Sequence, residues 1–193
     1  ATAVEFARNG ANVCIVDVNA EGLDTLAEEI KSIGANVSSY ICDVSDEQRV
    51  HEITQEIINQ YGKIDILVNN AGLWRMWKPF VETTSDEWKK RLSVNVLGLM
   101  YFTHEVLPNM IENSYGRIIN IGSVAGVYGN ANMADYSMTK GAVSSFTKAL
   151  AKEVADKGIT VNNVVPGSVR NEGTNRETEL CYMGRCGELE EYA

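Results

Sequence analysis

Apolar runs and amphipathic stretches alternate along this chain. The apolar runs are short and rich in Val and Ile, which is typical of buried strands, and they lie at 12–18, 36–44, 63–72, 116–126 and 159–167. The amphipathic stretches carry apolar residues at helical spacing, and they lie at 2–10, 20–34, 45–62, 85–113 and 134–157. Strands that alternate with helices predict βαβ units and a parallel sheet covered on both faces by helices.

Local signals predict where several helices begin and end. Gly10 and Gly34 follow the first two helices and are typical of helix C-termini. Ser45 is followed three residues later by Gln48, a capping-box pattern that predicts Ser45 as the N-cap of the third helix. Pro108 lies inside the fourth predicted helix, where we expect it to kink the helix or to end it early.

These elements predict an α/β protein with a doubly wound, Rossmann-like parallel sheet in three α/β/α layers. No linker, repeat or low-complexity tract interrupts the pattern, so we expect residues 1–193 to form a single domain. A doubly wound sheet rarely begins on a helix, whereas this pattern does, and the last segment, "GELEEYA", begins a helix that nothing follows. We therefore expect an internal piece of a longer protein, truncated at both ends.

Charge and composition restrict the partners of this protein. The formal net charge is −9 and no basic run is present, which argues against nucleic acid and anionic membranes. No apolar stretch approaches the ~20 residues that span a bilayer. Cys14 and Cys42 lie in strand-like runs, where a thiol packs as a small hydrophobe, and the sequence has only two histidines. We therefore expect no metal site and a cytoplasmic location.

Small, polar or turn-forming residues follow every predicted strand. Ligands of open α/β sheets bind beyond the carboxyl ends of the strands, so these residues predict a binding site at that edge of the sheet. A sheet without a ligand also needs turns there, so the five positions support a site more strongly together than singly. They are Asp17, Asp43-Val44, Asn69-Asn70-Ala71-Gly72, Ser123 and Pro166-Gly167.

Asp17 is the most informative of these residues. A carboxylate at this strand end can accept hydrogen bonds from both hydroxyls of an adenosine ribose, and it repels a 2′-phosphate. No Arg offsets that charge, because Val18 and Asn19 come next, so the sequence favours NAD over NADP. The alternative is that Asp17 only turns or caps the chain before the next helix. A Gly-rich pyrophosphate turn would lie about 20 residues before Asp17, outside this sequence.

Tyr136 and Lys140 are four residues apart and share a helix face, but this spacing alone does not distinguish a catalytic pair from two solvated side chains. Together with the strand-end residues, the pair resembles the short-chain dehydrogenase/reductase family over nearly the whole chain. Order and spacing fit, with Tyr136 13 positions after Ser123. The matching motifs are Asn69-Asn70-Ala71-Gly72, Asn95 in "LSVNVLG", Ser123 in "INIGSVAG", Tyr136-Ser137-Met138-Thr139-Lys140 and Pro166-Gly167.

The resemblance implies hydride transfer between a nicotinamide cofactor and a secondary alcohol or ketone. It makes Tyr136 the general acid or base, and a free Tyr has a pKa of ~10, so we expect the nearby Lys140 cation to lower that pKa. Ser123 is implied to donate a hydrogen bond to the substrate oxygen. Asn95 is implied to hold a water molecule that links Lys140 to bulk solvent.

The resemblance also implies a set of cofactor contacts. Asp17 would bind the adenosine ribose, and Asp43 with the backbone of Val44 would hold the adenine. Lys140, beside Tyr136, would hold the nicotinamide ribose. The remaining contacts are Asn69, Ala71 and Gly72 beneath the adenosine half, and Pro166, Gly167 and the backbone of Val169 behind the nicotinamide.

Some segments differ from the family pattern or have two interpretations. Asn171 stands four residues after Gly167, where the family often has Thr, which leaves that contact open. The polar stretch 168–183 predicts a mobile substrate lid. Trp74, Met76 and Trp77 form an apolar loop that either lines a substrate pocket or packs against its own domain or a neighbouring subunit.

Three further residues and two helices have an expected role. His51 and His104 lie within helices away from the strand ends, and we expect them to be structural. Tyr128 lies between Ser123 and Tyr136, where it would be able to touch the substrate. The helices that carry Asn95 and Tyr136 have small and apolar faces, and the resemblance implies that they form a dimer interface within a homotetramer. Packing inside the subunit is the competing use of those faces.

Three functions fit this sequence. The first is an NAD-dependent oxidoreductase that acts on a small-molecule alcohol or ketone. The second is a 3-oxoacyl-carrier-protein reductase, a group that usually prefers NADPH and often has basic residues near the lid, so Asp17 and the net charge of −9 count against it. The third is a non-catalytic Rossmann-fold binding protein, against which the complete set of Asn95, Ser123, Tyr136 and Lys140 argues.

Overall fold

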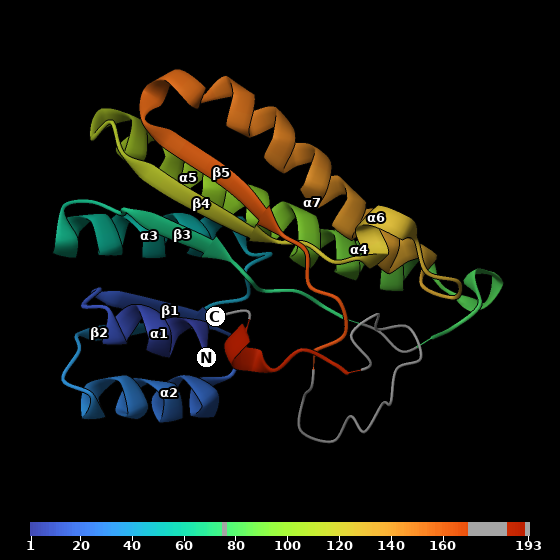
Figure 1. Cartoon of the computed structure of the whole chain (residues 1–193), viewed down its shortest axis with the longest axis horizontal. Coiled ribbons are helices and arrows are strands. Elements are labelled where there is room, and N and C mark those ends of the chain that lie inside the picture. Colours follow the sequence, from blue (N-terminus) through green and yellow to red (C-terminus); the bar gives the residue numbers. More distant parts are fainter. Residues whose placement is uncertain (75–76, 170–184, 192–193) are drawn as a thin grey trace. The chain divides into compact units, whose positions relative to one another are not determined.

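The computed structural model describes residues 1–74, 77–169 and 185–191. The chain divides into two compact units, Ala1–Cys42 with Pro166–Ala193, and Asp43–Val165. Each unit contains parallel strands with helices packed against them, which confirms the predicted α/β class and its Rossmann-like pattern (Figure 1). The described strands pair as one sheet of two strands and one sheet of three.

The first unit contains the two-stranded sheet. Its elements are α1 (Thr2–Arg8), β1 (Val13–Asp17), α2 (Ala20–Ser32), β2 (Val37–Ile41) and the short 3-10 helix η4 (Leu189–Glu191). β1 and β2 run parallel, with Val13 opposite Val37 and Asp17 opposite Ile41. Leu23, Ala27 and Ile30 recur at helical spacing on α2, so one face of that helix is apolar and is buried in the core of this unit.

The second unit contains the three-stranded sheet. Its strands β3 (Ile66–Asn69), β4 (Gly116–Ile121) and β5 (Ile159–Val164) pair in that order, all parallel. The helices are α3 (Glu47–Tyr61), α4 (Ser85–Leu92), α5 (Leu99–Glu112), α6 (Ala125–Tyr128) and α7 (Ala134–Glu153). Three short segments complete the unit: the 3-10 helices η1 (Phe80–Glu82) and η3 (Ala155–Lys157), and the π-helical η2 (Ser93–Gly98).

Packing of α5 and α7 on the sheet forms the core of the second unit. α5 packs on β3 and β4, and α7 packs on β4 and β5 (Figure 1). Met110 of α5 and Ile118 of β4 are fully buried there, with Leu150 of α7 beside them. The carboxyl ends of the three strands are thereby held at fixed positions, which matters because the residues after them carry the predicted chemistry.

The structure corrects the predicted N-cap of α3. Asp46, not Ser45, precedes the helix, and the Asp46 side chain accepts a hydrogen bond from Arg49 N at 3.1 Å. Ser45 bonds instead to Asp43, whose Oδ1 accepts from Ser45 N and Oγ at 2.9 and 2.7 Å. Ser and Asp are both favoured as N-cap residues, so the sequence alone does not decide between Ser45 and Asp46. The C-terminal glycines were predicted correctly: Gly10 and Gly34 have φ of 86° and 82°.

The structure corrects one half of the prediction for Pro108: the helix does not end early there, and a kink stays a prediction. α5 continues past Pro108 to Glu112, because the residue lies on the exposed side of the helix, where water can bond the carbonyl that loses its partner. The break in the predicted helix 85–113 lies earlier, at η2, where six residues widen into a π-helix. Asn95 lies in this segment and is 2% exposed. Single π turns within α-helices recur at functional sites.

Candidate active site

Ser123 and Tyr136 meet beyond the carboxyl end of β4. Ser123 follows β4 by two residues, and its Oγ accepts a hydrogen bond from Ala125 N at 3.1 Å, which fixes the hydroxyl. Tyr136 lies in the first turn of α7 and is 9% exposed. The Ser123 side chain bonds to the Tyr136 side chain. A hydroxyl bound in this way stabilises the phenolate form of Tyr136.

Burial determines the direction in which the pKa of Tyr136 moves. Desolvation raises this pKa, and the hydrogen bond from Ser123 lowers it by a smaller amount. The prediction that Lys140 lowers it is wrong for this structure. Lys140 Nζ lies 6.0 Å from the centre of the Tyr136 ring and donates instead to the Ile121 carbonyl. The phenol is therefore held in its protonated form at neutral pH.

Lys140 is a buried cation on the same helix. The residue is 6% exposed, and its Nζ donates a hydrogen bond of 2.7 Å to the carbonyl of Ile121, the last residue of β4. Burial lowers the pKa of Lys140 from 10.5 to about 8. Gly72 lies next to this ammonium, because a Cβ at Gly72 would stand 3.5 Å from Nζ and equally close to Asn95 Oδ1. A side chain at that position would cover the ammonium.

Asn95 joins three segments of the second unit. Its Oδ1 accepts from Leu73 N at 2.6 Å, and its Nδ2 donates to Leu73 O at 3.2 Å and to Thr139 Oγ1 at 3.1 Å. η2 is therefore attached to the turn after β3 and to α7. Both ends of the amide have protein partners, and the water molecule that Asn95 was expected to hold stays a prediction.

Thr139 is a site residue that sequence reasoning missed. It is fully buried, and its Oγ1 donates to Tyr136 O at 2.8 Å while accepting from Asn95. Thr139 thus connects the π-helical segment to the backbone of Tyr136. The sequence offered one signal for Thr139: it is a hydroxyl residue that lies between Tyr136 and Lys140. If Tyr136 and Lys140 both face the protein interior, the position of Thr139 on the helix faces it too.

A second buried network supports the strand ends. Asn69 Nδ2 donates to Asn120 Oδ1 at 2.9 Å and to Thr103 Oγ1 at 3.1 Å, and Asn120 Nδ2 donates to Thr147 Oγ1 at 2.9 Å. These bonds link β3, β4, α5 and α7. The side chain of Asn69 is thus engaged inside the unit. Asn120 was missed, although a polar residue at a buried position of an alternating strand signals such a network.

The predicted adenine contacts of the second unit are Asp43 and Val44. Hydrogen bonds from the side chain and backbone of Ser45 hold the pKa of the exposed Asp43 carboxyl below its usual value, and the charge of Lys90 adds to this effect. Val44 is buried against η2: a Cβ at Gly98 would stand 2.6 Å from Val44 Cγ2. Ala71 and Gly72 are exposed in the turn after β3.

The other predicted cofactor residues belong to the first unit. Asp17 is the exposed last residue of β1, and its Oδ1 accepts from Asn19 N at 2.9 Å. Asp17 therefore forms a local turn before α2, as the alternative interpretation expects. This turn uses one of its two carboxylate oxygens. Gly167 follows Pro166, and among the described residues no atom beyond its chain neighbours lies within 4 Å of the position of a Cβ; Val169 forms a parallel bridge with Gly187. The structure thus brings Asn95, Ser123, Tyr136, Lys140 and Gly72 together in one unit.

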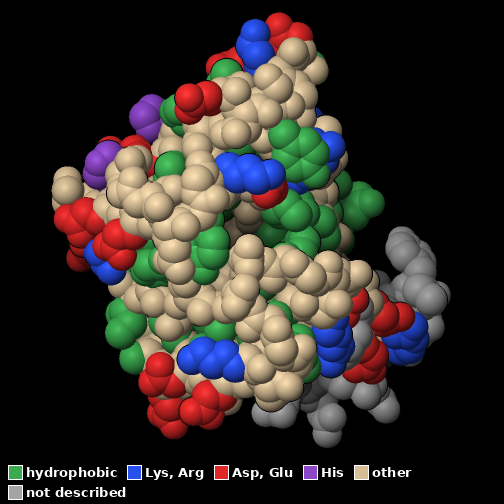
Figure 2. Space-filling view, turned by 90° about the vertical axis from the view of Figure 1, so that its left-hand side faces the viewer, with side chains coloured by type: hydrophobic (Ala, Val, Ile, Leu, Met, Phe, Trp, Pro, Cys, Tyr) green, Lys and Arg blue, Asp and Glu red, His purple; other side chains and the backbone are tan. Residues whose placement is uncertain are grey.

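The remaining candidates are surface residues or lie outside the described chain. Trp74 and Trp77 are 57% and 43% exposed, and Tyr128 is 84% exposed. Met76, Asn171 and the expected lid from 170 onward lie outside the described residues. Both histidines are on the surface beside acidic side chains (Figure 2), and His51 Nδ1 bonds Glu105 Oε2 at 2.7 Å.

No helix in the described part of the chain has the length and hydropathy to cross a membrane. Within the same residues, no three His, Cys, Asp or Glu side chains gather in a way that would hold a metal ion.

A parallel α/β fold with a buried Tyr and Lys and a half-buried Ser beyond its strand ends is typical of a class of nucleotide-dependent oxidoreductases. The family model for short chain dehydrogenases matches residues 1–180. The 3-oxoacyl-[acyl-carrier-protein] reductase FabG of Thermotoga maritima is 37% identical over 201 residues, which cover 100% of this chain and 81% of that protein. This chain belongs to the short-chain dehydrogenase/reductase family, and it is an NAD(P)-dependent oxidoreductase of CH–OH and keto groups.

Solved structures agree with this assignment. NAD+-bound xylitol dehydrogenase superposes with a TM-score of 0.92 at 30% identity, over 99% of this chain and 83% of that one. ElxO with NADP bound superposes with a TM-score of 0.90 at 33% identity, over 96% of this chain and 79% of that one. Proteins of the same fold thus bind either dinucleotide, so the choice between them depends on the residues of this chain.

Proposed function

We propose that this protein transfers a hydride between NAD(H) and a secondary alcohol or ketone, with Tyr136 as the general acid or base. The observation that carries the proposal is the hydrogen bond between the Ser123 and Tyr136 side chains beside the buried Lys140 ammonium. An acid, a hydrogen-bond donor and a cation in one place are what carbonyl reduction requires.

Each side chain has a defined task in the reduction. The bound nicotinamide supplies the hydride. Tyr136, whose pKa is raised by burial, is protonated at neutral pH and donates its proton to the carbonyl oxygen as negative charge develops there. Ser123, fixed by Ala125 N, directs its hydroxyl at the same oxygen. In the reverse direction Tyr136 accepts the proton of the alcohol, and the hydrogen bond from Ser123 favours its phenolate.

The residues around Lys140 fit a nicotinamide ribose. Lys140 is positively charged at neutral pH, with a pKa of about 8, and its Nζ offers donors beyond the one that binds Ile121. Gly72 places no side chain over the ammonium, which leaves room for ribose hydroxyls. We therefore assign the ribose to Lys140 and Tyr136, and the adenosine half to the exposed turn with Ala71 and Gly72.

A preference for NAD is supported by Asp17. Its carboxylate is exposed at the end of β1, no Arg follows it, and a 2′-phosphate placed there would be repelled. The hydrogen bond from Asn19 N to Oδ1 orients the group without neutralising its charge. Pro166, Gly167 and the backbone of Val169 complete the proposed cofactor contacts behind the nicotinamide.

A panel of ketones and alcohols, assayed with NADH or NAD+ and separately with NADPH or NADP+, tests this proposal. We expect oxidation of NADH by at least one ketone and a kcat/KM with NADH well above that with NADPH. Binding of NADH without turnover of any substrate would favour the non-catalytic binding protein instead. Binding of neither cofactor would contradict the proposal.

A 3-oxoacyl-carrier-protein reductase is the second candidate. The observation in its favour is the 37% identity over the full chain to a protein of that name. It predicts reduction of a 3-oxoacyl thioester with NADPH, faster on the carrier protein than on a small thioester. Turnover of free ketones with NADH and slow turnover of the carrier-bound substrate would reject it.

A homodimer or homotetramer is the proposed assembly. Apolar side chains remain exposed on the two helices expected at the interface: Leu97 of η2 and Met100 of α5 are 40% and 41% exposed, and Met138 of α7 is 50% exposed. Burial of such side chains is what a stable interface between copies requires. Light scattering that gives the mass of one chain would contradict this assembly.

We also propose a cytoplasmic location. Cys14 is a free thiol, and burial raises its pKa to about 11, so that thiol is unreactive. Free cysteines are typical of a reducing compartment. Cell fractionation that places the protein in an oxidising compartment would contradict this location.

A further inference from the structure

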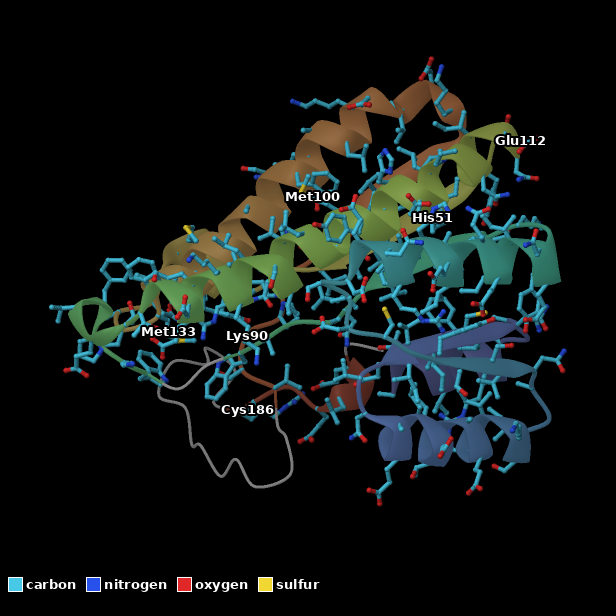
Figure 3. All side chains as sticks on the ribbon, turned by 180° about the vertical axis from the view of Figure 1, so that it is seen from behind. His51, Lys90, Met100, Glu112, Met133 and Cys186 are labelled. Atoms are coloured by element: carbon cyan, nitrogen blue, oxygen red, sulfur yellow. The ribbon has the colours of Figure 1, made fainter. Side chains whose placement is uncertain are left out.

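A buried ion pair lies directly before the Tyr136 position in the chain. Arg91 of α4 and Asp135 of α7 have side chains that are 9% and 3% exposed, and Arg91 Nη1 donates to Asp135 Oδ2. The pair connects two helices that pack together at this end of the unit, where Figure 3 labels Lys90 on α4 and Met133 just before α7. Buried charges of this kind are costly, so they call for a reason.

Asp135 also organises the first turn of α7. The residue at the N-cap position is Met133, whose side chain makes no capping hydrogen bond. The first turn of a helix has N–H groups without helical partners, and one of them belongs to Tyr136. Asp135 Oδ1 accepts from Tyr136 N at 3.0 Å, so one oxygen of the carboxylate holds the Tyr136 backbone while the other holds Arg91.

The backbone of Tyr136 is thereby held on both sides by side chains. Its N–H donates to Asp135, and its carbonyl accepts from Thr139 Oγ1 at 2.8 Å. Thr139 is tied in turn to Asn95 of η2. The backbone that carries the Tyr136 phenol is therefore tied to two preceding helical segments, through Arg91 of α4 and through Asn95 of η2.

We propose that Arg91 and Asp135 are positioning residues for Tyr136: Arg91 compensates the buried Asp135 carboxylate so that this carboxylate can anchor the Tyr136 N–H. The inference rests on the proposed function, because it gives Tyr136 a geometry that catalysis requires. The pair does not serve stability alone, since Arg91 Nε is buried without a hydrogen-bond partner in the described structure, which an apolar side chain would avoid.

The variant Arg91→Met tests this role. It removes the guanidinium that donates to Oδ2 of the buried Asp135 carboxylate, so we expect the first turn of α7 to open or to admit water. Displacement of the Tyr136 hydroxyl from Ser123 should lower kcat by about 10- to 100-fold, while KM for the ketone changes by less than about threefold. Arg91→Lys restores a charge without the planar guanidinium, and we expect it to recover only part of kcat.

The double variant Arg91→Met with Asp135→Asn separates positioning from a general loss of structure. Its amide oxygen can still accept from Tyr136 N, and no buried charge remains to be compensated. We expect its kcat to exceed that of Arg91→Met by about tenfold, a coupling that independent sites would not give. Arg49→Met, at the exposed pair with Glu52 and Glu56 on α3, is the matched control, and its kcat should equal that of the wild type.

Hydrogen exchange of the peptide 133–140 gives a readout that needs no turnover. We expect faster exchange there in Arg91→Met, and exchange near that of the wild type in both the double variant and Arg49→Met. Unchanged exchange in Arg91→Met, or an active variant with kcat within about twofold of the wild type, would overturn the inference. The wild type could lack activity while exchange is still faster in Arg91→Met. That pair of results would reject the proposed function and retain the anchoring role of Arg91 and Asp135.

Discussion

Lys140 is a cation in a site that leaves 6% of its surface exposed. A pKa lowered from 10.5 to about 8 means that the charged form is disfavoured by about 3 kcal/mol relative to water. The unfolded chain binds a proton at Lys140 that the folded chain lacks between these two values. The free energy of unfolding therefore increases as pH rises from about 8 to 10.5. Below pH 8 the full cost of burying the charged Lys140 side chain is present.

Replacement of Lys140 by Met should thus stabilise the protein and abolish its activity. We expect the free energy of unfolding at pH 7 to rise by about 1–2 kcal/mol, because the loss of the bond to Ile121 O offsets part of the gain. Urea unfolding of both proteins at several pH values measures this. The raised pKa values of Cys14 and Tyr136 lower the free energy of unfolding as pH rises above 9. Both residues are present in the variant and in the wild type, so their contributions cancel in the difference. A Lys140→Met protein less stable than the wild type at pH 7 would contradict this account.

The residues that form the site were largely predictable from the sequence, whereas their contacts were not. Its strand-end position indicated Ser123, because a parallel sheet places such residues at one edge, and the family motif indicated Tyr136; the structure brings the two side chains together, and their catalytic roles stay a proposal. The pKa of Tyr136 was predicted to be lowered, whereas burial raises it, because sequence spacing reveals neither the extent of burial nor the bond from Lys140 to Ile121. Thr139 was missed for the same reason.

At the scale of elements, the alternation of apolar runs and amphipathic stretches located every described strand and the main helices. Their ends required tertiary information. The predicted helix 85–113 changes to a π-helix at η2, where Gly98 packs on Val44, a residue more than fifty positions earlier in the chain. Periodicity within one segment carries no information about such a contact. The predicted helix 134–157 ends at Glu153 and continues only as the short η3.

The contact between Gly98 and Val44 gives a prediction for this element. Gly98→Ala would place a Cβ 2.6 Å from Val44 Cγ2 and 2.9 Å from Val44 O, so η2 must shift. We expect a loss of about 1–3 kcal/mol in the free energy of unfolding and weaker NADH binding, since Val44 is a proposed adenine contact. Adding Val44→Ala should return part of the stability, and calorimetry measures both. A Gly98→Ala protein as stable as the wild type would show that the segment yields freely.

At the scale of the whole molecule, the proposed cofactor residues are distributed over both units. The prediction that residues 1–193 form a single domain stays a prediction, which one cooperative unfolding transition would support and two separate transitions would contradict. The fold class itself was predictable, because hydrophobic periodicity reports secondary structure directly and βαβ alternation admits few topologies.

Cofactor choice is the property of the whole molecule that Asp17 should control. Asp17→Ser removes the carboxylate that would bind the ribose hydroxyls and repel a 2′-phosphate. We expect NADH to bind about tenfold more weakly and NADPH more tightly than to the wild type, as measured by fluorescence titration. Asp24→Ser on α2, an exposed acidic residue of the same unit, is the control for a general change of charge. Equal affinities of Asp17→Ser and wild type for both cofactors would leave Asp17 a turn residue.

Stopped-flow mixing of Tyr136→Phe with NADH and a ketone that the wild type reduces tests whether the Tyr136 hydroxyl transfers the proton. The variant keeps the ring and its burial but lacks the proton. The account predicts NADH binding within about threefold of the wild type and a hydride-transfer rate at least about 1000-fold slower. A rate within about tenfold of the wild type would contradict the role of Tyr136 as the general acid or base.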